Sequence, residues 1–392
     1  MINNNFTSLV LIMTILFINS SCKRLPPNIQ SVQNTGITTE VFVDGIDIPW
    51  GIDFLPSGEM LVTNRDGNLY RVTNGKKTEI MGLPDVYTRG QGGLLDIKVH
   101  PRYTKNKWIY ISYSTKASNE GGNTSLMRFQ LDGNHINNKE VLFKALPDTR
   151  SGVHFGSRIV FDKNDYLFLS VGERGNWDNA QMLSNHSGKI HRLKDDGSIP
   201  EDNPFFNEAG AIKSIYSYGH RNPQGMVIHP FTGKIWEHEH GPKGGDEVNI
   251  VEKGKNYGWP KITYGINYNG MTISKDTAMA GMEQPLIYWK PSIAPSGMAF
   301  ISTNKYGEDI KGNLLVGSLK FNYLHHCIVK NGQITKEERL IENIGRVRCG
   351  KEGPDGFIYV AGGGGKVLKL LLRFCSLIHR LICYYNTKLI HF

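Results

Sequence analysis

Hydrophobic residues recur along this chain as two short apolar segments separated by a turn. The pattern occurs six times, and Gly, Pro, Asn or Asp is present in most of the turns. Runs of this length, bounded by turn residues, are typical of β-strands joined into hairpins. The six pairs of expected strands are, in chain order, 50–55 with 60–63, 94–99 with 108–113, 158–161 with 166–171, 225–228 with 234–237, 297–301 with 313–317, and 346–349 with 357–361. Self-similarity at a long period predicts a propeller or a solenoid.

The spacing of the copies favours one closed ring of six blades. Residues 41–370 divide into six units of about 55 residues each, close to the ~40–50 residues of known blade repeats. No helical pattern lies between the strands, which argues against a parallel sheet with crossover helices. We therefore predict an all-β, six-bladed β-propeller over residues 38–370, in which the segment 38–43 completes the last blade and protects its edge. A stacked β-sandwich is the alternative.

The N-terminal segment has the pattern of an export signal. The stretch from Phe6 to Ile18 is almost continuously apolar but short for a transmembrane helix, and Ser20-Ser21-Cys22 follows it. We expect residues 1–21 to be a signal peptide. The lipoprotein type, with Cys22 as the lipid acceptor, is favoured over a plain signal peptide cleaved nearby. Residues 22–37 would then be a linker, and the protein would be exported, either periplasmic or anchored as a lipoprotein in the bacterial cell envelope.

Charge and composition exclude one class of partner. The formal net charge is +9, from 45 Lys and Arg against 36 Asp and Glu. Such an excess suits an anionic partner, but no basic cluster is interleaved with aromatic residues, so we expect no nucleic-acid binding. The stretch 371–392 is an atypical tail, apolar and basic. A surface helix is one interpretation of it, and a disordered extension or a reading-frame accident is the favoured one.

The five cysteines are Cys22, Cys327, Cys349, Cys375 and Cys383. They form no Cys-x-x-Cys pair, and their spacings do not indicate a disulfide framework. We therefore expect no thiolate metal site and interpret Cys327 and Cys349 as free buried thiols.

Polar and charged residues occupy equivalent positions in the expected blades. In a propeller, the residues just before the innermost strand and just after the second strand of each blade line the same mouth of the central channel. The residues at such positions are Gln91, His154, Arg221, Asn222, Lys320, Arg346 and Arg348. Arg346 and Arg348 are two residues apart and therefore share a face. The group suits a compact, highly anionic ligand, because Arg binds carboxylates bidentately. Taken singly, each residue could instead be a solvated rim charge or a structural histidine.

The segment His238-Glu239-His240 has the composition of a metal motif. Strand alternation would place the two histidines on one face and Glu239 on the other. The loop that follows, 241–247, is rich in carbonyl and carboxylate oxygens, which calcium prefers. We therefore predict calcium rather than zinc here, and we interpret the two histidines as packing groups or as groups that support the ligands.

Eight short motifs identify a family. They are Gly90-Gln-Gly-Gly-Leu-Leu-Asp96, His154-Phe-Gly-Ser-Arg158, Gly219-His-Arg-Asn-Pro-Gln224, Glu239-His-Gly-Pro242, Gly245-Asp-Glu-Val-Asn249, Asn256-Tyr-Gly-Trp-Pro260, Gly317-Ser-Leu-Lys320 and Gly345-Arg-Val-Arg348. With these motifs the chain resembles, from Ile48 to Leu370, the soluble sugar dehydrogenases that depend on pyrroloquinoline quinone (PQQ). Its length places it beside the shorter aldose sugar dehydrogenases of that family.

The resemblance implies an enzyme that oxidises aldoses at C1 to the lactone. Hydride would pass to PQQ, and electrons would pass on to an external acceptor, either a cytochrome or a quinone. His154 would be the general base for the proton of the C1 hydroxyl, and Arg221 would stabilise the charge that develops on the cofactor oxygen. The residues implied in PQQ binding are Gln91, Arg221, Asn222, Tyr268, Lys320, Arg346 and Arg348.

The resemblance also implies calcium as a second cofactor. The backbone carbonyls of Gly241 and Pro242 would bind the active-site ion, which would act as a Lewis acid on the quinone. Glu247 and Tyr257 would belong to a second, structural calcium site. The implied substrate is a small aldose, and the implied assembly is a monomer or a homodimer.

Two residues depart from the family pattern, and two other functions compete. Cys349 stands where the family usually has Asp after the second Arg, and Val153 stands where a polar residue usually precedes His154. One alternative function is a non-catalytic extracellular propeller that serves as a binding module, which would not need these cations together. The other is a calcium-dependent lactone hydrolase, whose metal site would want carboxylates and Asn rather than four cations.

Overall fold

The computed structural model describes residues 36–117 and 121–372. The expected signal peptide, Cys22, most of the expected linker and the tail from residue 373 lie outside the described residues. The strands, in chain order, are β1 (Ile37–Val43), β2 (Pro49–Phe54), β3 (Met60–Asn64), β4 (Leu69–Thr73), β5 (Lys76–Ile80), β6 (Leu94–Val99), β7 (Ile109–Ser114), β8 (Thr124–Asp132), β9 (His135–Lys144), β10 (Ile159–Phe161), β11 (Leu167–Val171), β12 (Lys189–Leu193), β13 (Ile215–Tyr218), β14 (Pro223–Ile228), β15 (Ile235–Glu239), β16 (Asp246–Val251), β17 (Ile287–Trp289), β18 (Pro295–Phe300), β19 (Leu314–Ser318), β20 (Leu324–Lys330), β21 (Gln333–Ile341), β22 (Cys349–Glu352), β23 (Ile358–Gly362) and β24 (Lys366–Leu372). Two short helices accompany them, α1 (Tyr103–Asn106) and the 3-10 helix η1 (Trp177–Gln181). Within the described ranges, no helix is long and apolar enough to cross a membrane.

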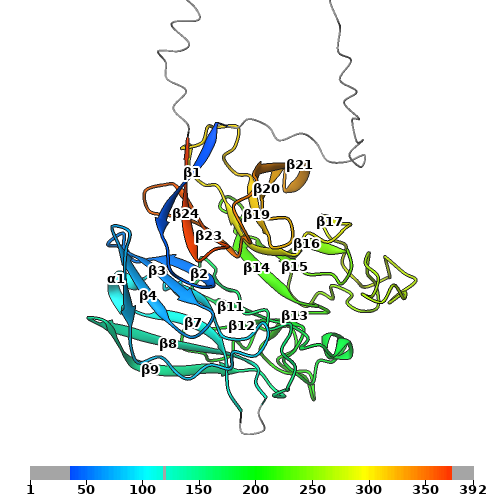
Figure 1. Cartoon of the computed structure of the whole chain (residues 1–392). Helices are drawn as coiled ribbons and strands as arrows, with labels where there is room; N and C mark the ends of the chain where they lie inside the picture. Colours follow the sequence, from blue (N-terminus) through cyan, green and yellow to red (C-terminus); the bar gives the residue numbers. More distant parts are fainter. Residues whose placement is uncertain (1–35, 118–120, 373–392) are drawn as a thin grey trace, which may run out of the picture. The chain divides into compact units, whose positions relative to one another are not determined.

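The strands form six four-stranded antiparallel sheets (Figure 1). Five sheets consist of four consecutive strands, from β2–β5 to β18–β21, whereas the sixth combines β22, β23 and β24 with β1. The innermost strands are β2, β6, β10, β14, β18 and β22. Each of them contacts the innermost strands of both neighbouring sheets, so the ring is closed. The predicted all-β, six-bladed propeller is confirmed.

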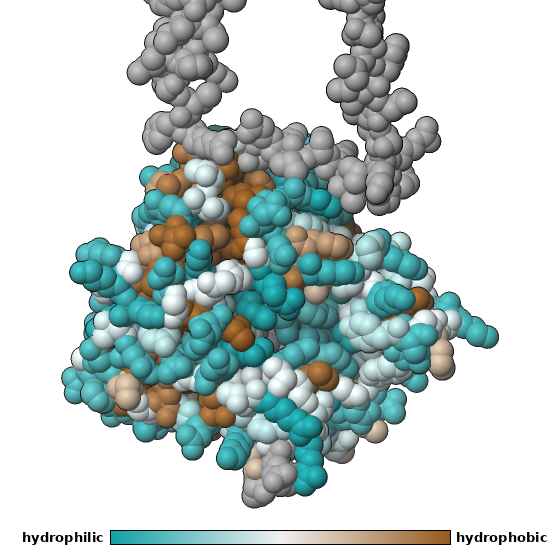
Figure 2. Space-filling model, viewed as in Figure 1, coloured by the Kyte–Doolittle hydropathy of each residue, from teal (hydrophilic) through white to brown (hydrophobic). Residues whose placement is uncertain are grey.

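The ring is closed by β1, which lies beside β24 (blue and red in Figure 1). The two strands are antiparallel, with Ile37 opposite Leu372 and Val41 opposite Leu368. The N-terminal strand therefore completes the last blade, as the sequence predicted, and the sheet extends to Leu372, two residues past the expected boundary. Hydrophobic atoms are exposed over this part of the surface (Figure 2), where Val41 is 50% and Leu372 38% exposed.

Five of the six predicted hairpins match the first two strands of a blade to within one or two residues at each end. The sixth is a correction: its first strand was expected at 346–349 but spans Cys349–Glu352. The alternation Arg-Val-Arg is typical of a strand, and Val347 is indeed buried. However, the register with β23 begins only at Cys349, opposite Ala361. The preceding residues form instead the loop that enters the channel, starting at Gly345 with a φ of +80°.

Hydrophobic side chains fill the spaces between neighbouring blades. Six core clusters correspond to the six spaces, and each combines residues from two adjacent sheets. On β3, for example, Leu61 packs toward the second blade, while Met60 and Val62 pack toward the sixth. Because both faces of each sheet are buried, a central strand is apolar at successive positions. This packing fixes the loops at the ends of the innermost strands, where the predicted site residues lie.

Candidate active site

His154 lies in the loop between β9 and β10, at the mouth from which the innermost strands begin. Its φ of +56° is in the left-handed region, which a non-glycine residue adopts at a cost and which often marks a functional site. Its N–H donates to Oε1 of Gln91 over 2.9 Å, which connects two of the predicted residues. Its Nδ1 lies 2.7 Å from Oε1 of Glu173, so Nε2 is the nitrogen that can face a ligand.

Glu173, which follows β11 directly, was not singled out from the sequence. Its side chain is fully buried, and its carboxylate accepts hydrogen bonds from His154 and from the N–H of Gly175. Burial lowers the pKa of His154, and the charge of Arg221 lowers it further, whereas the hydrogen bond with Glu173 opposes both. The lowered pKa favours the neutral imidazole, which is the form that a base must have. Residues just after the second strand of a blade line the same mouth as residues just before its first strand. The criterion that pointed to His154 therefore applies to Glu173 as well.

The backbone before His154 is held by Arg174, another buried residue that the sequence analysis did not identify. Its guanidinium donates to the carbonyls of Ser151 and Val153. Val153 is one of the two departures from the family pattern. It is 36% exposed, and it takes part in this contact through its backbone carbonyl. His154 is thus oriented by its backbone and by Glu173, without a polar side chain at position 153.

Arg221 and Asn222 precede β14 and are both buried. Nη1 of Arg221 donates to the carbonyls of His240 and Gly241, over 2.9 and 3.0 Å. Oδ1 of Asn222 accepts the N–H of Gly156 over 3.1 Å. Nε of Arg221 and Nδ2 of Asn222 are buried donors that have no hydrogen-bond partner within the described chain. Because an unsatisfied buried donor is costly, these two atoms indicate acceptors supplied from outside the chain.

Lys320, Arg346 and Arg348 lie at the ends of the fifth and sixth blades, as predicted. Nη1 of Arg346 donates to the carbonyl of Leu319 over 3.2 Å, which places Arg346 next to Lys320 along the rim. Val347, between the two arginines in the chain, is buried. Lys320 and Arg346 are exposed and Arg348 is half-buried, which leaves their charges available to a ligand.

Electrostatic effects show that these groups share one mouth. Burial lowers the pKa of His240 to about 3, and the charges of Arg221, His154 and Arg348 lower it further. Burial, together with neighbouring positive charges that include Arg65, lowers the pKa of Arg348 to about 10. Arg65 follows β3, at another mouth position, and was not identified from the sequence. Arg65, Arg221 and Arg348, from three different blades, therefore face one region.

His238 and His240 act as packing groups, in agreement with their interpretation from the sequence. Nε2 of His238 lies 3.2 Å from the carbonyl of Gly297, and Nε2 of His240 is hydrogen-bonded to the carbonyl of Pro295. Both contacts join the fourth blade to the fifth, so neither of these nitrogens is left for a metal ion.

Three carboxylates of the fourth blade form a buried cluster with His220. Glu239 and Glu247 lie opposite each other on β15 and β16, and Nδ1 of His220 is 3.4 Å from Oε1 of Glu239 and 3.8 Å from Oε1 of Glu237. The ring of His220 stacks on Tyr257, with centroids 4.6 Å apart. Burial raises the pKa values of Glu237 and Glu247 well above the usual range, and Oε2 of Glu237 has no partner among the described residues. A bound cation would relieve this excess of negative charge.

Three of the four predicted calcium residues lie together. Gly241, Glu247 and Tyr257 line one small cavity, together with Glu239 and Arg221. Pro242 is buried beside Gly241 in the chain. Tyr268, which was expected to border PQQ, lies in the loop between β16 and β17, is 69% exposed and is not among the residues of this cavity.

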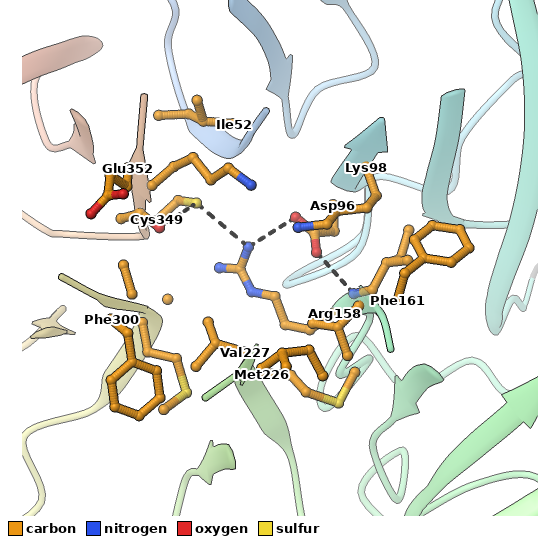
Figure 3. A pocket seen from close by; sticks show the side chains of 18 of the residues that line it. Ile52, Asp96, Lys98, Arg158, Phe161, Met226, Val227, Phe300, Cys349 and Glu352 are labelled. Atoms are coloured by element: carbon orange, nitrogen blue, oxygen red, sulfur yellow. Dashed lines mark hydrogen bonds and ion pairs between the residues drawn. The ribbon is translucent and has the colours of Figure 1, made fainter. Parts of the chain in front are cut away.

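Arg158 lies in the central channel, where Figure 3 shows its guanidinium between Asp96 and Cys349. It connects its own blade to four others. Its Nη1 is 3.1 Å from Oδ1 of Asp96 on β6, and its Nε donates to the carbonyl of Gln224 on β14 over 2.7 Å. Its Nη2 donates to the carbonyl of Arg348 over 2.6 Å. Its guanidinium lies over the ring of Trp50 on β2, 3.9 Å from the centroid. Arg158 therefore holds together the strands that form the floor below the cationic mouth.

Past Arg158 the channel contains a cavity of about 390 Å³ (Figure 3). Its lining comes from the later parts of the innermost strands, so it lies toward the opposite end of the channel from His154. Cys349, the second departure from the family pattern, faces this cavity, with Sγ 3.9 Å from Nη1 of Arg158. Lys351 and Lys98 both approach Asp53, at 2.7 and 3.9 Å. The positive charges of both lysines are therefore paired with the carboxylate of Asp53, and the lysines lie away from the mouth.

Comparison with known proteins agrees with the motifs. A family model described as glucose/sorbosone dehydrogenase matches residues 46–369. The aldose sugar dehydrogenase YliI of Escherichia coli is 41% identical over 344 residues, which cover 85% of this chain and 92% of that protein.

Solved structures give the same result. The soluble aldose sugar dehydrogenase of Escherichia coli in its apo form has a TM-score of 0.83 and 40% identity, and the match covers 86% of this chain and 100% of that one. The PQQ-bound form of an aldose sugar dehydrogenase from Streptomyces coelicolor has a TM-score of 0.72 and 26% identity, over 86% of this chain and 97% of that one. These relatives are oxidoreductases named for sugar substrates, and one of them has been solved with PQQ.

Proposed function

The chain belongs to the glucose/sorbosone dehydrogenase family, and on this basis we propose that it oxidises aldose sugars at C1 to the lactone, with PQQ and calcium as cofactors. The observation that carries the proposal is His154, held by the buried carboxylate of Glu173, at a mouth lined by Arg221, Arg348 and other cations. A base beside a strongly cationic pocket suits proton removal from a sugar hydroxyl next to a polyanionic cofactor.

The residues present fit PQQ, which carries three carboxylates. The buried donors Arg221 Nε and Asn222 Nδ2 need acceptors, and a carboxylate or quinone oxygen supplies them. The crowded charge around Arg348, which lowers its pKa, favours an anionic ligand. We propose that Gln91, Lys320 and Arg346 complete the PQQ site; Tyr268 remains a proposed neighbour on the basis of family resemblance alone. When bound, PQQ would accept the two electrons of the sugar C1–H bond.

The residues present also fit calcium. We propose that the carbonyls of Gly241 and Pro242 bind an ion at the active site, where it polarises a cofactor oxygen. Glu247 and Tyr257 would belong to a second, structural site, and the buried carboxylate cluster around Glu239 supports a cation there. Oxygen donors of this kind suit a hard cation.

The chain's own residues would position the substrate and move its proton. Nε2 of His154 would accept the proton of the C1 hydroxyl, while Glu173 at Nδ1 fixes the ring and stabilises the imidazolium that forms. Arg221, anchored by the carbonyls of His240 and Gly241, would hold its positive charge where negative charge develops. The number of cations at the mouth supports this function over a calcium-dependent lactone hydrolase and over a non-catalytic binding module.

Reconstitution tests the proposal. Purified protein freed of metal and cofactor should be inactive, and PQQ with Ca²⁺ should restore dye-linked oxidation across a panel of aldoses, whereas NAD should not. Absence of PQQ binding by calorimetry, or activity with NAD alone, would contradict the proposal. The preferred acceptor, cytochrome or quinone, follows from the same assay with each candidate in place of the dye.

Export and assembly are further proposals that follow from the sequence. We propose that the chain is processed at Cys22 and lipidated, in the envelope of a bacterial cell, and that it acts as a monomer or a homodimer. Mass spectrometry of envelope material tests the first point, since an unmodified N-terminus beyond Cys22 would exclude lipidation. Light scattering at several concentrations tests the second.

A further inference from the structure

The fifth blade contains a second group of potential metal ligands, outside the active site. His325 and Cys327 lie on β20, and Glu337 lies on the neighbouring strand β21. Residues two apart on a strand share a face, and Glu337 is the register partner of Cys327. One potential ligand atom from each of the three residues lies within 4.8 Å of the other two. Three side chains of different chemistry thus converge from two rigid strands.

The contacts within this group leave one buried nitrogen without a partner. Nε2 of His325 lies 2.7 Å from Oε2 of Glu337, and Nε1 of Trp289 donates to the same oxygen over 2.6 Å. Nδ1 of His325 has no hydrogen-bond partner within the described residues, although His325 is only 7% exposed. Cys327 is fully buried and forms no disulfide. His325 therefore has one buried nitrogen without a partner, and Cys327 has a free thiol, beside a carboxylate that is held by His325 and Trp289.

We propose that His325, Cys327 and Glu337 bind a divalent transition metal ion, and that this ion is Zn²⁺. Imidazole, thiolate and carboxylate are all zinc ligands, whereas calcium takes oxygen donors and would not use Cys327. The negative charges of the Cys327 thiolate and the Glu337 carboxylate would neutralise the two positive charges of the ion. The ion and its ligands together would then have little net charge, which lowers the cost of burying them. Trp289 orients the carboxylate, as groups behind a metal ligand commonly do.

The surroundings allow the ion to enter. The side chain of Glu337 is 33% exposed, while that of His325 is 9% exposed, so the site opens toward solvent on the Glu337 side. Water can therefore complete a four-coordinate shell, which needs only small movements of ligand atoms already close together. The ion would join β20 to β21 and, through Trp289, to β17 of the fourth blade. Because the ligands meet only in the folded chain, binding would stabilise the fold.

Co²⁺ is the probe that identifies the ligands, because thiolate coordination gives it a charge-transfer absorption. Tag-free, full-length protein freed of metal should bind Co²⁺ with such a band, and Zn²⁺ but not Ca²⁺ should displace it. Cys327→Ser should abolish the band, whereas Cys349→Ser, which removes the other buried cysteine of the described chain, should retain it. A band that persists in Cys327→Ser, or folded wild-type protein without a band, would overturn the proposal.

Glu337→Gln provides a second variant in case Cys327→Ser does not fold. Because this carboxylate is partly exposed, its replacement by an amide of the same shape should be tolerated. Its Zn²⁺ affinity should fall by at least about tenfold, and the rise in Tm that Zn²⁺ produces in the wild type should shrink accordingly. Glu342→Gln, which alters an exposed ion pair with Arg339, is the matched control and should keep both. Unchanged Zn²⁺ affinity in Glu337→Gln would exclude this carboxylate as a ligand.

Discussion

Nδ1 of His154 lies 2.7 Å from Oε1 of Glu173, and the side chain of Glu173 is fully buried. A buried carboxylate with no cation bound to it directly is costly unless its hydrogen bonds are complete, and here they go to the imidazole and to the N–H of Gly175. The arrangement fixes the ring and directs Nε2 away from Glu173. We therefore assign Glu173 as the positioning residue for the proposed base.

Glu173→Gln should lower kcat by about 10–100-fold while leaving the Kd of PQQ unchanged. The amide can still accept the Nδ1–H hydrogen bond, but it has no charge to stabilise the imidazolium. Single-turnover rates and PQQ titration of the same preparation would separate these two effects. Glu140→Gln, which alters an ion pair with Arg128 on the outer strands, is the control and should leave kcat unchanged.

The pH profile distinguishes a positioning role from a loss of structure. Burial lowers the pKa of His154, and the hydrogen bond and charge of Glu173 raise it partway back. Removing that charge should lower the pKa further. Since the base must be neutral, the acid limb of the kcat profile should then move to lower pH. A fall in kcat at every pH with an unmoved acid limb would contradict the assignment.

His154→Ala should lower kcat by about 10²–10⁴-fold, as expected for a lost general base. PQQ should bind as in the wild type, because the side chain of His154 contacts Glu173, and its contact with Gln91 is made by the backbone N–H, which the substitution retains. His154 has a positive φ, so His154→Asn, which tolerates that conformation, is the second variant. Normal turnover in both variants would show that another group is the base. His135→Ala, on the outer strand β9, is the control.

Arg348→Ala should show the opposite pattern. Loss of one charge-assisted contact, worth about 1.5–3 kcal/mol, should weaken PQQ binding by roughly tenfold to 100-fold, and saturating PQQ should restore much of the rate. Burial and neighbouring cations already lower the pKa of Arg348, so a bound anion should be stabilised strongly at this position. Calorimetric titration gives the Kd. Arg71→Ala, whose side chain bonds the carbonyl of Gly133, is the control, and equal affinity in Arg348→Ala and the wild type would remove Arg348 from the site.

The sequence predicted the fold because every blade repeats one hairpin whose turns and apolar strands are visible locally. The contact between His154 and Gln91 agrees with the same reasoning, because equivalent positions in a ring of blades face one axis. Glu173 and Arg65 lie just after the second strands of their blades, so the same rule applies to them, although they were not among the predicted residues. The outermost strand of the first blade, β5, has four of five residues exposed, so it lacks the apolar pattern by which the inner strands were predicted.

Other contacts could not be predicted from the sequence because they depend on how distant segments meet. Arg174 is adjacent to Glu173 in the chain, but its contact with the segment before His154 depends on loop conformation. The group of His325, Cys327 and Glu337 depends on the register of β20 and β21, and spacing along the chain gives no signal of the Cys-x-x-Cys kind. The contacts of Arg158 with four other blades follow from closure of the ring.

Arg158→Met should destabilise the fold more than any of the substitutions at the mouth. Its guanidinium and Asp96 are both buried, 3.1 Å apart, and removal of one partner leaves an unpaired buried carboxylate, at a cost of about 3–5 kcal/mol. Urea unfolding followed by tryptophan fluorescence measures the free energy of unfolding. Arg102→Met is the matched control, because its ion pair with Asp165 is as short, at 2.7 Å, but its side chain is 55% exposed. That exposed pair should contribute at most about 1 kcal/mol. Equal losses in the two variants would show that Arg158 is an ordinary ion-pair partner and not the residue that holds the channel together.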